Sequence, residues 1–154
     1  RMIKKITVLL IVVFFTASCG FTPIYSNKNN YNILIEELNF TGDRKLNNFL
    51  KSNLNRYRNN DNASKKISLE VLTNYQKVTL SKDLTGKVNK YELIADVTFT
   101  IMPNNQKLVF NQSKIMENMS NKTDEKDYEN STKQTFANVI TNELIYKLAE
   151  MKWL

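Results

Sequence analysis

Residues 91–101 read Tyr-Glu-Leu-Ile-Ala-Asp-Val-Thr-Phe-Thr-Ile, and this stretch carries the clearest structural signal in the chain. Every second residue from Tyr91 to Ile101 is apolar, whereas the positions between them are polar except for Ile94. Successive side chains of a β-strand point to opposite faces of a sheet. The alternation therefore predicts a strand with one face in a core and the other in water.

The segments on either side predict two more strands of the same sheet. Residues 103–105, Pro-Asn-Asn, are turn-forming, so residues 107–118 are expected to fold back as an antiparallel strand. The residues expected to point inward there are Leu108 and Phe110. Upstream, residues 67–80 alternate in the same way and predict a long strand, and residues 81–86 predict the turn that follows it.

An additional strand and a helix precede this meander. Residues 31–40 predict a strand with a bulge near Glu36 and Glu37. Asp43 is placed to cap a helix, because a carboxylate accepts hydrogen bonds from the free N–H groups of the first turn. Apolar residues then recur at spacings of three and four, which predicts a helix over 44–58 with one apolar stripe.

The chain ends with a second predicted helix. Residues 121–127 are charged and polar and predict a loop, and residues 127–151 predict a helix whose apolar stripe runs from Phe136 to Met151. The order is β-α-β-β-β-α. We therefore predict an α+β fold, a two-layer sandwich with two helices on one face of a four-stranded sheet. The sheet is mixed if the first strand joins it in parallel across the helical connection, and antiparallel otherwise.

The N-terminus has the three parts of an export signal. Basic residues precede an apolar run from Ile6 to Phe15, and Thr-Ala-Ser leads to Cys19, the only cysteine. A cysteine directly after small residues is typical of bacterial lipoprotein signals. We predict a signal peptide over 1–18, a lipidated tether over 19–30 and one α+β domain over 31–154, with a diacylglyceryl and acyl lipid on Cys19. Residue 1 is Arg, so translation is expected to start at Met2 or upstream.

Two other interpretations of this N-terminus remain open. The apolar run could anchor the chain in a membrane, although about a dozen residues fall short of the roughly 20 that a spanning helix needs. In the other interpretation the protein is simply secreted, and Cys19 is an ordinary thiol.

Loss of residues 1–18 removes three cations and lowers the net charge of the chain from +7 to +4.

Composition narrows the function classes. The sequence contains no histidine, and lipidated Cys19 is not a free thiol, so Cys/His catalysis and an ordinary zinc site are excluded. We predict no catalytic residue, no metal and no cofactor beyond the covalent lipid. The basic excess is mild and dispersed, which argues against nucleic acid as a partner.

The start of the predicted mature chain, Cys19-Gly-Phe-Thr-Pro-Ile-Tyr25, resembles the LPS-assembly lipoprotein family. The hairpin of residues 91–110 and the terminal helix around Phe136 are similar to that family as well. The resemblance implies the two-layer fold described above. It also implies a lipoprotein that plugs and helps assemble the outer-membrane β-barrel translocon of lipopolysaccharide, and that binds lipopolysaccharide. Gly20 fits sorting to the outer membrane, with the domain facing the periplasm.

Lipopolysaccharide is anionic, so lysines near the turn between the long strands are its candidate ligands. These are Lys77, Lys82, Lys87 and Lys90. Two other function classes stay open. One is an accessory lipoprotein of a secretion or barrel-folding complex. The other is an enzyme that uses Asp96 with Glu70 or Glu92.

Overall fold

The computed structural model describes residues 32–59 and 63–151. Cys19, the predicted signal peptide and the tether lie outside these residues. The elements, in chain order, are β1 (Ile33–Gly42), α2 (Arg44–Leu54), the short 3-10 helix η1 (Asn55–Tyr57), β2 (Lys65–Lys82), β3 (Val88–Met102), β4 (Gln106–Glu117) and α3 (Lys122–Glu150). The predicted order β-α-β-β-β-α is confirmed.

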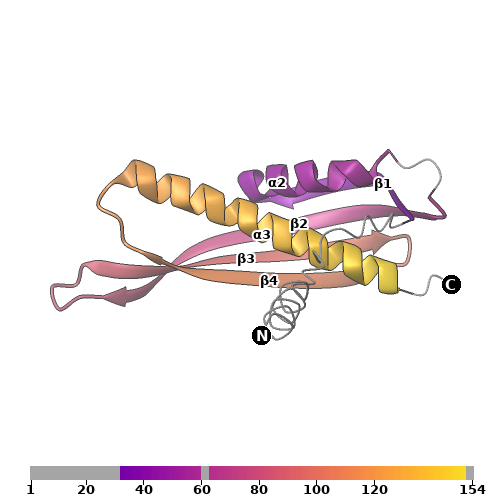
Figure 1. Ribbon diagram of the computed structural model, residues 1–154. Helices are drawn as coiled ribbons and strands as arrows, with labels where there is room; N and C mark the ends of the chain where they lie inside the picture. The colour runs from indigo at the N-terminus through magenta and orange to yellow at the C-terminus, as the bar shows by residue number, and fades with distance from the viewer. Residues whose placement is uncertain (1–31, 60–62, 152–154) are drawn as a thin grey trace, which may run out of the picture. The chain divides into compact units, whose positions relative to one another are not determined.

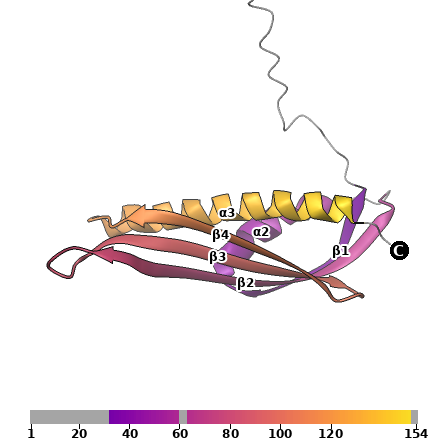
Figure 2. The same cartoon turned by 90° about the horizontal axis from the view of Figure 1, so that it is seen from below.

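The four strands form one sheet in the order β1-β2-β3-β4 (Figure 1). β1 runs parallel to β2, and β2, β3 and β4 are antiparallel neighbours. The sheet is therefore mixed, and the helical connection between β1 and β2 explains the parallel pair. Both helices lie on one side of the sheet, and in the view from below the strands lie in front of α2 (Figure 2).

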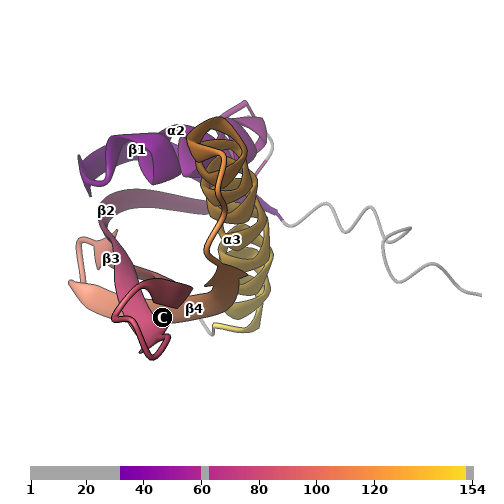
Figure 3. The ribbon, with the colours of Figure 1, turned by 90° about the vertical axis from the view of Figure 1, so that its left-hand side faces the viewer.

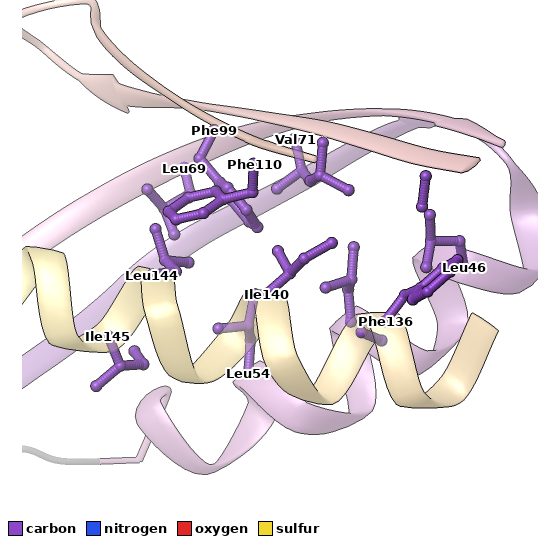
Figure 4. Packing of buried hydrophobic residues seen from close by; sticks show 14 of the residues in the cluster. Leu46, Leu54, Leu69, Val71, Phe99, Phe110, Phe136, Ile140, Leu144 and Ile145 are labelled. Carbon is purple, nitrogen blue, oxygen red and sulfur yellow. The ribbon is translucent and has the colours of Figure 1, made fainter. Parts of the chain in front are cut away.

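The end view shows α3 running along one side of the strands (Figure 3). One apolar core fills the space between the sheet and the helices (Figure 4). The alternating residues of β3 point into it as predicted, since Leu93, Ala95, Val97, Phe99 and Ile101 are buried. The helices contribute one stripe each: Leu46, Leu50 and Leu54 from α2, and Phe136, Ala137, Ile140, Leu144, Ile145 and Leu148 from α3. Each leucine, isoleucine or phenylalanine among them contributes about 1.5–3 kcal/mol when fully buried.

The connection from β1 into α2 is fixed by three neighbouring features. The predicted bulge is present, because the pairing of β1 with β2 shifts between Ile35 and Glu37. Gly42 then takes a positive φ of 104°. The Asp43 carboxylate accepts a 2.7 Å hydrogen bond from the Leu46 N–H, so Asp43 caps α2 as predicted. The bend at Gly42 brings the Asp43 N–H within 3.3 Å of the Thr73 carbonyl oxygen.

The start of α3 differs from the prediction. The helix begins at Lys122, so the loop expected over 121–127 is wrong. The Asn121 side chain caps the helix by accepting a hydrogen bond from the Thr123 N–H, and Asp124 and Glu125 place negative charge in the first turn. Acidic groups there are favourable because the helix dipole is positive at its N-terminus. Polarity was therefore a poor guide to loop structure in this segment.

The two positive-φ glycines give a matched pair of substitutions. A Cβ at Gly42 would lie 1.8 Å from the Thr73 carbonyl oxygen, whereas a Cβ at Gly86 would meet nothing within 4 Å. We predict that Gly42→Ala lowers the free energy of unfolding by more than about 2 kcal/mol, and that Gly86→Ala costs only about 1 kcal/mol, from the left-handed backbone. Urea denaturation measures both. Equal losses would contradict the close approach at Gly42.

Candidate functional site

The turn between β2 and β3 is held by its own hydrogen bonds. The Asp83 N–H donates to the Lys87 carbonyl at 2.8 Å, and the Gly86 N–H donates to the Asp83 carbonyl at 3.0 Å. The Asp83 carboxylate accepts from the Thr85 N–H, the Thr85 hydroxyl and the Lys87 N–H at 2.8, 2.6 and 2.9 Å. An aspartate that bonds the backbone ahead of it is a recurrent way to order a turn.

The charge of Asp83 is part of this arrangement. The hydrogen bond from the Thr85 hydroxyl, the two backbone N–H groups and the nearby Lys87 ammonium keep the pKa of the Asp83 carboxyl below its usual value. The ionised form accepts all three hydrogen bonds, since a carboxylate is a pure acceptor. Ionised Asp83 therefore orders the turn at neutral pH through hydrogen bonds that lie within the turn itself.

The side chains that this turn presents are both apolar and basic. Leu84, at its apex, is fully exposed, and Val78 and Leu80 on β2 are 43% and 48% exposed. Lys82 and Lys87 are exposed beside the apex, and neither forms an ion pair with another described residue. We call residues 78–90 the hairpin tip. It extends beyond the start of α3 in two perpendicular views (Figures 1 and 2).

The four candidate lysines do not form one cluster. Lys82 and Lys87 lie at the turn, and Lys90 pairs with Glu117 on β4 at 3.0 Å in an exposed position. Lys77 lies farther back on β2, and its ammonium forms ion pairs with Glu125 and with Glu129, the latter at 2.7 Å. Lys77 therefore has a structural role. Sequence reasoning missed Leu84, although an apolar residue in an otherwise polar turn was visible.

Two groups of ion pairs attach the first turns of α3 to the sheet. In the first, the Glu125 carboxylate forms ion pairs with Lys77 and with Lys122. The Lys77 ammonium also lies 4.3 Å from the centre of the Tyr91 ring. Glu125 is only 6% exposed. The hydrogen bonds from Lys122 and Lys77 hold the pKa of Glu125 below its usual value despite burial. A buried charge with two partners is stable, whereas removal of one partner is costly.

The second group joins α3 to the start of α2. Lys133 donates to the Asp43 carboxylate at 2.9 Å and lies 3.8 Å from the centre of the Tyr75 ring. Burial opposes ionisation of Asp43, but the hydrogen bonds from Leu46 and Lys133 outweigh it and lower its pKa. Burial together with Glu129, which accepts from the Tyr75 hydroxyl at 3.4 Å, raises the pKa of Tyr75. Asp43 thus caps α2 and also binds α3 through Lys133.

The carboxylates proposed for an enzyme are not brought together. Asp96 lies on the face of β3 away from the helices, opposite Asn74 and Asn111, and accepts a hydrogen bond from Asn111. Glu92 is four residues away on the same strand, and Glu70 pairs with Thr100, four residues along in the other direction. Four residues of strand span about 13 Å. This spacing is too wide for two carboxylates to act on one bond.

Over residues 32–59 and 63–151, no group of three or more His, Cys, Asp or Glu side chains is arranged to hold a metal ion. No helix within these ranges combines the length and the hydrophobicity needed to cross a membrane.

Three solved structures with a similar fold are described as lipoproteins. Rare lipoprotein B of Shewanella oneidensis matches with a TM-score of 0.52 at 16% identity, over 72% of this chain and 95% of that chain. A minor lipoprotein of Acinetobacter baumannii matches with a TM-score of 0.50 at 16% identity, over 73% and 94%. Lipoprotein B of Nitrosomonas europaea matches with a TM-score of 0.52 at 13% identity, over 79% and 88%. Likeness at this identity shows a shared fold.

No family model matches the sequence, and no curated protein sequence matches it either. The fold therefore rests on the structure and on its likeness to the three lipoproteins.

Glu125 provides a test of the ion pairs that hold α3. Its pKa is lowered in the folded state, so its stabilising contribution is present above its ordinary value of 4.5 and is lost as the pH falls through the folded-state pKa. We predict that Glu125→Gln lowers the free energy of unfolding by about 1–3 kcal/mol at pH 7. The difference from the unchanged protein should shrink steadily below pH 4.5.

Thermal or urea unfolding across that pH range measures the effect. Asp124→Asn is the matched control, because Asp124 is exposed in the same helical turn and has no ion-pair partner among the described residues. A difference that stayed constant with pH would show that the Glu125 charge does not stabilise α3.

Proposed function

We propose that this chain is a non-enzymatic lipoprotein of the bacterial outer membrane that binds lipopolysaccharide through its hairpin tip. In this proposal it also plugs, and helps to assemble, the β-barrel that exports lipopolysaccharide. The observation that carries the proposal is the tip itself, a turn in which fully exposed Leu84 is flanked in sequence by exposed Lys82 and Lys87.

The chemistry of the tip suits an anionic amphiphile. Lipopolysaccharide combines phosphate groups and acidic sugars with acyl chains. Lysine ammonium groups bind phosphate as compact charges, and an exposed leucine gains free energy when it leaves water for acyl chains. Among the four predicted ligands, Lys82, Lys87 and Lys90 serve this role. Lys77 instead joins β2 to α3, next to the tip, through its ion pairs with Glu125 and Glu129.

The location follows from Cys19. A single acyl chain gives only marginal membrane binding, whereas several chains on one residue anchor a protein stably. A lipidated Cys19 keeps the domain at the membrane without a spanning helix. Three lipoproteins share the fold, which supports the same manner of attachment here.

The uncovered face of the sheet suits a place inside a barrel. The interiors of outer-membrane barrels are polar and wet. The row Asn74, Asp96 and Asn111 crosses this face, and Glu70, Thr100 and Lys107 form another polar row. The same face carries exposed Leu72 and Val109 opposite Thr98, which suits direct contact with a protein wall.

An accessory subunit of a secretion or barrel-folding complex is the second candidate. The exposed pair Leu72 and Val109 favours it equally, because apolar side chains on a sheet face suit any protein partner. The two candidates differ in the barrel that copurifies. Isolation of the native protein from outer membranes, followed by mass spectrometry, is expected to identify the lipopolysaccharide translocon barrel. Recovery of a different barrel or a secretion complex would favour the second candidate.

Tip variants test lipopolysaccharide binding. We predict that Leu84→Ser weakens binding of purified lipopolysaccharide at least about tenfold, because a leucine moved into an apolar environment contributes about 1.5–3 kcal/mol. The double variant Lys82→Gln/Lys87→Gln should weaken it to a similar extent. The control Lys107→Gln/Lys147→Gln removes the same charge from exposed sites outside the tip and should bind normally. Equal binding by all four proteins would remove the tip from the proposal.

Cys19→Ala tests the anchor separately. The described core draws its members only from residues 33–148, so we predict that this variant folds normally. It should be released from the membrane fraction by a high-salt wash, unlike the unchanged protein, and lack the mass of an attached lipid. Membrane retention equal to that of the unchanged protein would contradict the lipid anchor.

A further inference from the structure

The segment over 44–59, which contains α2 and η1, carries positive charge only. It has five cationic side chains and no acidic one, and all five are exposed. They are Arg44, Lys45, Lys51, Arg56 and Arg58. Arg44, Lys51 and Arg58 follow one another at intervals of seven residues, which is two helical turns. We call these five residues the basic face.

The basic face has no partner within the described chain. None of its five side chains forms an ion pair with a described residue. Asp43, the acidic residue closest in sequence, is engaged by Lys133 at 2.9 Å. The Arg56 guanidinium lies 5.0 Å from the centre of the Tyr57 ring, and this cation–π contact leaves its charge unneutralised. Five unneutralised cations on one short segment attract an anionic surface.

The apolar side of the same helix is already used. Leu46, Leu50 and Leu54 are completely buried in the core. No apolar stripe of α2 is left to insert between acyl chains, as an interfacial amphipathic helix would. Contact with a membrane would therefore be made by charge alone, at the level of the headgroups.

The C-terminal part of the basic face, with Arg56 and Arg58, lies at the end of the sheet where the chain enters the domain, whereas Arg44 follows the far end of β1. η1 packs against β1, and the Ser64 N–H donates to the Asn32 side chain at 2.8 Å. Asn32 is the first described residue, and residues 20–31 join it to Cys19. A fully extended link of that length spans at most about 40 Å. A lipid on Cys19 would thus hold the basic face close to the leaflet in which it is embedded.

We propose that the basic face binds the phosphate headgroups of anionic phospholipids in the leaflet that holds the Cys19 lipid. This inference rests on the lipid anchor of the proposed function, but not on lipopolysaccharide binding. The hairpin tip lies at the opposite end of β2, an 18-residue strand about 55 Å long. The domain therefore has a membrane-facing end and a free end that presents Leu84.

The electrostatic contribution of each cation sets the expected effect. A lysine or arginine near an anionic membrane surface strengthens binding about fivefold, and salt screens this attraction within about 10 Å. Loss of three cations should therefore weaken vesicle binding at least about tenfold at low salt.

Vesicle cosedimentation tests the proposal on the chain from residue 19 with Cys19→Ser, which has no lipid of its own. We expect binding to vesicles of phosphatidylglycerol and phosphatidylethanolamine, with loss at high salt, and no binding to phosphatidylcholine vesicles. The variant Lys51→Gln/Arg56→Gln/Arg58→Gln should bind at least about tenfold more weakly. The matched control Lys107→Gln/Lys126→Gln/Lys147→Gln loses the same charge from exposed sites outside both the basic face and the hairpin tip, and should bind normally.

The outcomes separate this inference from the proposed function. Equal weakening by the two triple variants would show attraction by net charge alone and would overturn the basic face as a site, as would the absence of binding to anionic vesicles. Circular dichroism of each variant checks folding, and the salt dependence of the unchanged protein tests the charge contribution without any substitution. The basic-face variant should keep lipopolysaccharide binding through the hairpin tip, so each proposal can fail without the other.

Discussion

Burial of one apolar sheet face under two helices is the constraint on which the rest of this structure depends. The sequence has a single cysteine and therefore no disulfide within the chain, so the core supplies the stability that many small exported domains obtain from cross-links. Phe99 and Ile140 are completely buried within that core (Figure 4). Among the described residues the helices cover only one face, so the other face remains free for contact. The long strands β2 and β3 also extend past the helices and leave their turn exposed.

Charge fixes where the long helix lies on this apolar layer. Hydrophobic contact is not directional, so it does not by itself set the position of α3 along the sheet. Lys77 with Glu125, and Lys133 with Asp43, connect the N-terminal half of α3 to β2 and to the cap of α2. These pairs end where the hairpin tip begins. The tip is then ordered by the pairing of β2 with β3 and by the hydrogen bonds of Asp83, and it presents Leu84 beyond the start of α3.

Much of the fold could be predicted because its signals are local. Alternation in β3 predicted its buried face, Asp43 predicted the helix cap, and Glu36 and Glu37 marked the bulge. The start of α3 was missed because its first residues are polar and show no apolar stripe, and because the burial of Glu125 depends on Lys77, which is distant in sequence. The site was only partly predictable for the same reason. Lysines near a turn are visible in sequence, but the pairing of Lys77 with α3 and the full exposure of Leu84 follow from how the strands extend past the helix.

We propose that the exposed tip, and not another surface of this domain, binds lipopolysaccharide. Site-specific photocrosslinking in living cells tests it most directly, with a photoreactive amino acid at position 84 and, for comparison, at position 109 on the uncovered sheet face. We expect crosslinks to lipopolysaccharide from position 84 and crosslinks to a protein from position 109. Lipopolysaccharide adducts from position 109 alone, or none from position 84 in cells that export lipopolysaccharide normally, would contradict it.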